Sequence, residues 1–220
     1  MKNHILVCGL AGALLAGPAM ADGQIDFVID NGRVVPSEDF AVMVSVLGAA
    51  IAVNGQIDVP VTVQATIGSE SVEPWGDFRS AADGDVNDHS PARHYIHQEM
   101  LDEGEQITIS AKSWLPAIFG GRLHLTVNSH DQSQQVKVLR NGDPAPDITA
   151  YAGQSTAEFY VREYLEGGRV NIDENQVIYL FELGTTNVNG VDADFQDLVV
   201  LVTLGESVAA LTDKLEPLYD

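Results

Sequence analysis

Short segments in which apolar residues alternate with polar ones recur along the chain, and turn residues separate them. This alternation predicts β-strands, because successive side chains of a strand point to opposite faces of a sheet. The predicted strands, which either alternate in this way or are apolar at most positions, are residues 24–29, 40–53, 59–67, 94–99, 106–114, 122–128, 135–140, 176–183 and 197–204. So many short strands with few helices predict a mostly β protein, an antiparallel β-sandwich or jelly roll with one or two short helices.

The longest apolar segment, residues 40–53, is apolar on both of its potential faces. As a strand it would place Val42 and Val44 on one face and Met43 on the other. A strand of this kind is typical of the centre of a sheet that is covered on both sides. We therefore predict a central strand here. At a sheet edge, the same segment would offer a surface for self-association.

A helix is the alternative for this segment, because Ser37 could cap it and Gly55 could end it. The alternation of its β-branched residues favours the strand. Asn54 and Gly55 both tolerate positive φ, so they predict a tight hairpin turn with residues 59–67 as the partner strand.

Two helices are predicted nearer the C-terminus. Ser155 and Glu158 have the spacing of a capping box, in which each side chain satisfies a free backbone N–H of the first helical turn. Gly167 predicts the end of that helix. The second helix, a short one, is predicted over residues 207–215.

Residues 1–21 have the composition of a signal peptide, with a positive charge near the start, a short apolar run and small residues at the end. Its removal would leave residues 22–220 as a single secreted domain without cysteine. A proline-rich connector marks a candidate internal boundary near residues 143–150. We expect the mature protein to be secreted, periplasmic or at the cell surface.

The chain carries 11 Lys and Arg residues against 32 Asp and Glu residues, which gives a formal charge of −21. A protein this acidic repels phosphate groups and anionic lipid headgroups, so the charge argues against nucleic acid as a partner. No apolar segment after the signal peptide is long enough to span a membrane as a helix.

Carboxylates gather in residues 181–202, at the entry to an apolar strand. Glu182 ends one apolar strand, and Asp192, Asp194 and Asp197 follow a Gly- and Asn-containing loop. Carboxylates this close repel one another unless a cation or hydrogen bonds compensate. Calcium is the natural cation, because it takes about six to eight oxygen ligands. The four residues therefore predict a structural calcium site. A solvated acidic loop with Phe195 held in the core is the alternative. As a further option, Asp197 could accept backbone N–H groups as the cap of a turn.

The order of these residues resembles a bacterial extracellular family of domains of unknown function. Its members carry Phe-Glu-Asp-Leu, a Gly-rich loop and Asp-x-Asp-Phe-Asn-Asp before an apolar strand. The matching residues are Phe181, Glu182, Asp192, Asp194, Phe195 and Asp197. Leu183 and Gln196 stand where the family carries Asp and Asn. The resemblance covers residues 154–204 and implies a β-sandwich module of secreted, calcium-rich surface and adhesion proteins.

A second acidic stretch contains Asp83, Asp85, Asn87 and Asp88. Its alternate spacing is typical of the opening of a calcium loop, but the glycine and the glutamate that complete an EF-hand are missing. The stretch predicts a weaker calcium site, and an exposed polar turn is the favoured alternative. Nearby His94 and His97 would lie on opposite faces of a strand, which disfavours a shared zinc ion.

Trp75 and Trp114 are the candidate ligand-binding residues, because exposed aromatic rings beside carboxylates can stack on sugars. In the favoured alternative, both rings close the ends of the sandwich. The chain lacks the sequence motifs of serine hydrolases, zinc proteases and phosphate-binding loops. Paired carboxylates leave a glycosidase reaction open.

These features together predict a secreted, non-catalytic structural or adhesion and matrix-type domain that calcium stabilises. The alternative is a carbohydrate-binding module of the lectin kind, and the third hypothesis is a polysaccharide hydrolase. The expected partners are a second copy of the chain, a component of the cell surface or matrix, or a glycan.

Overall fold

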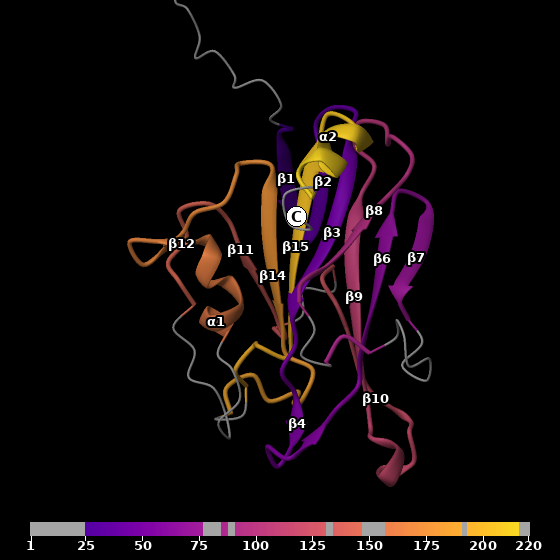
Figure 1. Cartoon of the computed structure of the whole chain (residues 1–220), viewed down its shortest axis with the longest axis vertical. Helices are drawn as coiled ribbons and strands as arrows, with labels where there is room; N and C mark the ends of the chain where they lie inside the picture. Colours follow the sequence, from indigo (N-terminus) through magenta and orange to yellow (C-terminus); the bar gives the residue numbers. More distant parts are fainter. Residues whose placement is uncertain are drawn as a thin grey trace, which may run out of the picture.

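A computed structural model describes residues 25–76, 85–87, 91–130, 134–146, 157–190 and 193–215. The predicted signal peptide lies outside the described residues. Two antiparallel sheets pack against each other and form most of the molecule (Figure 1). The prediction of a mostly β, sandwich-like fold is therefore confirmed.

The larger sheet has six strands, all antiparallel, in the order β1-β2-β9-β6-β7, and β10 also pairs with β9. Its strands are β1 (Phe27–Asp30), β2 (Arg33–Pro36), β6 (Val61–Ile67), β7 (Glu70–Trp75), β9 (Ile107–Trp114) and β10 (Leu123–Asn128). Strand β2 pairs with the start of β9, and β10 pairs with the rest of it. The hairpin of β9 and β10 therefore extends beyond the end of β2.

The smaller sheet has five strands in the order β11-β14-β15-β3-β8. Its strands are β3 (Ala41–Gly48), β8 (Arg93–Ile96), β11 (Val136–Leu139), β14 (Gln176–Phe181) and β15 (Leu198–Gly205). Two short hairpins accompany the sheets: β4 (Ala52–Val53) with β5 (Ile57–Asp58), and β12 (Leu165–Glu166) with β13 (Arg169–Val170).

The main core lies between the two sheets. Alternate residues of the smaller sheet, such as Val44 and Tyr179, face alternate residues of the larger sheet, such as Val63 and Ile109. The outer face of the smaller sheet is covered by α1 (Ala157–Val161) and the following 3-10 turn η2 (Arg162–Tyr164). The C-terminal α2 (Val208–Asp213) packs against β3 on the same face. Strands β3, β14 and β15 are therefore buried on both faces.

The central strand predicted for residues 40–53 is confirmed as β3, which lies between β15 and β8. The helix alternative for this segment is wrong. The hypothesis that this segment is an edge strand available for self-association is also wrong, because β3 is paired with a strand on each side. The strand is shorter than predicted, since β4 follows it as a separate element.

The hairpin turn at Asn54 and Gly55 is confirmed, with φ values of 52° and 66°. Its partner strand was predicted wrongly, because β4 pairs with the short β5. Residues 61–67 instead form β6 in the larger sheet, where they pair with β9 and β7. Pro60 has no N–H to donate to a continued hairpin, and its C=O accepts from Trp114 at 2.9 Å.

Strands β2 and β7 have no counterpart in the predicted segments. Strand β7 lies at a sheet edge, contains Pro74 and has three exposed residues among its six, so its sequence gives only a weak strand signal. The predicted C-terminal helix is confirmed as α2, and Ser207 Oγ accepts the Ala210 N–H at 3.1 Å. The other helix, α1, is shorter than predicted, and Ser155 lies outside the described residues. Within the described part of the chain, no helix has the length and apolarity to cross a membrane.

Candidate functional site

Glu182 follows β14 directly and is completely buried at the end of the smaller sheet. Its Oε1 accepts the backbone N–H groups of Gly184 and Thr185, both at 3.0 Å. Its Oε2 accepts those of Asp194 at 3.0 Å and Phe195 at 3.3 Å. A buried carboxylate needs several donors in place of water, and these four provide them. One side chain therefore holds together the two ends of the loop between β14 and β15.

Asp197 lies beside Glu182 and is also buried. Its Oδ2 accepts the N–H groups of Leu183 at 2.6 Å and Gly184 at 2.7 Å. Burial raises the pKa of the Asp197 carboxyl well above its usual value, and the charge of Glu182 and a hydrogen bond to it raise that pKa further. The Leu183 N–H opposes this increase. The raised pKa predicts that the Asp197 carboxyl binds a proton at a higher pH than a free aspartate does.

Three residues near the C-terminal end of the loop, Asp194, Phe195 and Gln196, are also buried. Asp194 Oδ2 accepts the side-chain N–H of Gln196 at 2.7 Å, and both residues are buried. Phe195 has a left-handed backbone with φ of 52°, which is uncommon for a residue with a side chain. Its ring is buried on the outer face of the smaller sheet, with Lys137 Nζ 3.8 Å from the ring centroid. The Glu182 carboxylate and this ring together hold the loop in its unusual path.

The structure brings Glu182, Asp194 and Asp197 together, whereas Asp192 lies outside the described residues. A calcium ion would need about six to eight oxygens directed at one point. Both oxygens of Glu182 and one of Asp197 are instead directed at backbone N–H groups. Among the described residues, no three His, Cys, Asp or Glu side chains form a group that could hold a metal. As placed, these carboxylates fit a hydrogen-bonded cluster rather than a calcium site, and calcium stays a prediction.

In the second acidic stretch, Asp85 and Asn87 are described, and Asp83 and Asp88 lie outside the described residues. Asp85 Oδ1 accepts the N–H groups of Val61 and Asn87, both at 2.9 Å. The Asn87 side chain is buried and donates to the C=O groups of Ile51 at 2.7 Å and Val59 at 2.9 Å. The exposed polar turn expected here is therefore wrong for Asn87, which connects the chain before β4 to the chain before β6.

His94 lies in β8, and His97 is the residue that directly follows this strand. His94 Nδ1 lies 2.8 Å from Ser45 Oγ across the β3–β8 pair, and burial lowers the pKa of His94. His97 is buried, and its Nδ1 lies 3.5 Å from Tyr95 Oη. Its Nε2 lies 3.9 Å from a carboxylate oxygen of Glu70 on β7. The histidines therefore take part in separate contacts.

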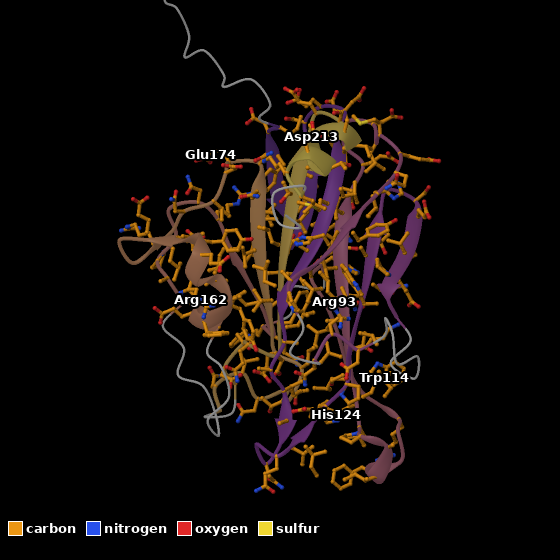
Figure 2. All side chains as sticks on the ribbon, in the orientation of Figure 1. Arg93, Trp114, His124, Arg162, Glu174 and Asp213 are labelled. Atoms are coloured by element: carbon orange, nitrogen blue, oxygen red, sulfur yellow. The ribbon has the colours of Figure 1, made fainter. Side chains whose placement is uncertain are left out.

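The two tryptophans differ in their exposure. Trp75 ends β7 and is buried in the main core, so its ring offers no face to a sugar. Trp114 is half-buried at the end of β9, and its Nε1 donates to Thr62 Oγ1 at 3.0 Å. Figure 2 shows Trp114 in the same half of the molecule as His124, whose Nε2 lies 3.4 Å from the C=O of Gly184. Trp114 alone keeps the surface that a stacked ligand would need.

Two hollows lie against the outer face of the smaller sheet, with volumes of about 610 Å³ and about 470 Å³. Tyr164 lines both hollows. The larger one has aromatic and charged walls that include Phe159, Arg162 and Glu163, and the smaller one contains the Ser45–His94 pair. Sequence reasoning missed both hollows, because Ser45 and His94 meet only through the register of β3 and β8.

No protein-family model, no curated protein and no solved structure matches this chain. The resemblance to a family of extracellular domains therefore stays a prediction, supported by the residues of the loop between β14 and β15 alone.

Proposed function

We propose that this chain is an exported, non-catalytic structural domain, and that its conspicuous acidic motif serves the fold of the sandwich end. The main support for this proposal is that the Glu182 carboxylate accepts hydrogen bonds from four backbone N–H groups in the core. A carboxylate whose lone pairs are used in this way is poorly placed to act on a substrate. The motif thus keeps one loop in a fixed shape on a domain that serves in a surface layer or matrix.

Calcium bound at the same loop is the alternative explanation of the motif. The convergence of Glu182, Asp194 and Asp197 favours it, since these are hard oxygen ligands on one irregular loop. The backbone N–H groups directed at Glu182 favour the hydrogen-bonded cluster instead. The two explanations differ in the response of the melting temperature to calcium and to EDTA.

Glycan binding is the second candidate function. The smaller hollow combines an aromatic wall, Tyr164, with polar side chains that include His94, Asn171 and Gln176. Mixed aromatic and polar walls are typical of sites that take sugars. If the smaller hollow binds a glycan, Tyr164→Ala should abolish retention on a glycan array. Trp114→Ala tests in the same way whether the Trp114 ring, the candidate from the sequence, binds the glycan instead.

The proposed function is tested with the mature chain, residues 22–220, and cell-envelope or matrix material from the organism that produces it. We expect the folded protein to sediment with this material, and the heat-unfolded protein serves as the control. A panel of polysaccharides incubated with the protein should show no new reducing ends. Two results would contradict the proposal. One is hydrolysis of any polysaccharide of the panel, and the other is a folded protein that sediments with none of the envelope or matrix fractions.

A further inference from the structure

The hairpin of β9 and β10 ends in an exposed apolar turn. Its apex, residues 115–123, contains the 3-10 turn η1 (Ala117–Phe119). Ile118 is 71% exposed, Phe119 47% and Leu123 46%. These are three of the six large apolar side chains that are exposed in the described part of the chain. In Figure 1 the hairpin extends past the sheets at the end opposite to α2, which is also the end that carries β4.

The backbone of this apex satisfies most of its own donors. The N–H groups of Phe119 and Gly121 donate to the C=O of Pro116 at 2.7 Å and 3.3 Å. The Gly120 N–H donates to Ala117 at 3.0 Å, and Pro116 has no N–H. Gly120 and Gly121, with φ of 99° and 58°, permit this tight path. A turn with satisfied donors can leave water at a smaller cost than an open loop.

The charge of the hairpin is opposite to that of the chain as a whole. Residues 106–130 contain no Asp or Glu, although the chain has 32 such residues. Lys112, near the middle of β9, pairs with Glu73 at 3.3 Å. Arg122, at the apex, is exposed and forms no ion pair with any residue that the structure describes. The apex therefore presents an apolar group together with one uncompensated positive charge.

A partner that binds this apex must accept apolar side chains and a cation through a very small contact area. A stable protein interface buries about 800 Å² on each partner, far more than three side chains on a single turn can offer. A lipid surface needs no matching cavity, and it takes apolar and aromatic side chains into the acyl boundary with a cation at the headgroups. The small area and the charge both favour lipid over a second protein.

We propose that the apex inserts into the interface of a lipid bilayer, with Ile118 and Phe119 at the acyl boundary and Arg122 at anionic headgroups. The acidic remainder of the chain does not prevent this at physiological ionic strength. Charges more than about 8 Å from the headgroups are largely screened there. This contact is reversible, because three side chains provide far less apolar area than a membrane-spanning helix.

Vesicle binding tests the proposal. The mature protein is mixed with phosphatidylcholine vesicles, with and without phosphatidylglycerol, and the bound fraction is measured by cosedimentation. We expect binding that is stronger with the anionic lipid. Ile118→Ser and Phe119→Ser should each reduce the partition coefficient by about tenfold. Arg122→Gln should reduce it by about fivefold, on the anionic vesicles only. All three positions are exposed, and an unchanged melting temperature verifies the fold of each variant.

Two further measurements make the result decisive. Val28→Ser removes an equally exposed apolar side chain from β1 and should leave binding unchanged. Phe119→Trp places a fluorophore at the apex, and we expect its emission to shift to the blue on addition of vesicles. The proposal is overturned if the protein binds neither kind of vesicle. Self-association without lipid that Ile118→Ser abolishes also overturns it, because the apex then contacts a second copy of the chain.

Discussion

Glu182 and Asp197 share one backbone donor, the Gly184 N–H, which lies 3.0 Å from Glu182 Oε1 and 2.7 Å from Asp197 Oδ2. Two carboxyl groups this close in the core cannot both be ionised without a large electrostatic cost. A proton on Asp197 would remove this cost and would supply a donor to Glu182, in line with the raised pKa of Asp197. The pair thus acts as one hydrogen-bonded unit at the turn that leads out of β14.

The pair predicts opposite effects of two isosteric substitutions. Asp197→Asn preserves an acceptor for Leu183 and Gly184 and supplies a permanent donor to Glu182. We expect its free energy of unfolding at neutral pH to lie within about 1 kcal/mol of the wild-type value, or above it. Glu182→Gln directs an NH₂ group at backbone N–H donors, and we expect a loss of about 3 kcal/mol. Urea denaturation measures both. Equal losses in the two variants would contradict the shared proton.

The same pair predicts a pH dependence. The pKa of Asp197 is higher in the folded protein than its unfolded value of about 3.8. Its contribution to stability is therefore fully present below about pH 3.8 and falls as the pH rises towards the folded pKa. Repulsion among the other carboxylates also changes with pH, so the measured quantity is the free energy of unfolding of the wild type minus that of Asp197→Asn. We expect this difference to decrease as the pH rises from 4, and a difference that increases would refute the assignment.

Calcium addition separates the hydrogen-bonded cluster from a metal site. With four backbone N–H groups on Glu182, we expect millimolar calcium and EDTA to leave the melting temperature of the wild type unchanged. The matched variant is Asp197→Asn, which leaves the hydrogen bonds in place and removes a calcium ligand. A calcium-dependent rise that this variant abolishes would establish the metal site and exclude the proton.

The strands that are buried on both faces could be predicted from the sequence, whereas β2 and β7 of the larger sheet could not. Strands β3, β14 and β15 have apolar side chains at nearly every position, so their pattern is strong. Strand β7 borders solvent and contains Pro74, so its residues need not alternate. The partner of residues 61–67 was missed because the adjacent hairpin is a local signal, whereas the pairing of β6 with β9 joins residues far apart in the chain.

The sequence could identify the acidic cluster but not its chemistry. Glu182, Asp194 and Asp197 were grouped correctly, because they flank one loop between two strands that prove to be neighbours. Residue type alone does not decide whether a carboxylate meets a cation or a backbone N–H. That choice depends on the path of the backbone. Phe195, for example, has a positive φ, and a positive φ cannot be predicted from the sequence when the residue is not glycine. The burial of Trp75 likewise follows from its pairing with Val63 across two strands.

Asn87 provides a test of the second acidic stretch. Its NH₂ group donates to the C=O groups of Ile51 and Val59 from a buried position. Asn87→Asp replaces this donor with a carboxylate that faces two carbonyl oxygens, and we expect the free energy of unfolding to fall by about 3 kcal/mol. A calcium site at this stretch predicts the reverse, because the added carboxylate would strengthen ion binding. Thermal unfolding of the variant with calcium and with EDTA distinguishes the two. A large loss under both conditions means that Asn87 is a structural donor, and stabilisation by calcium means that it is a ligand position.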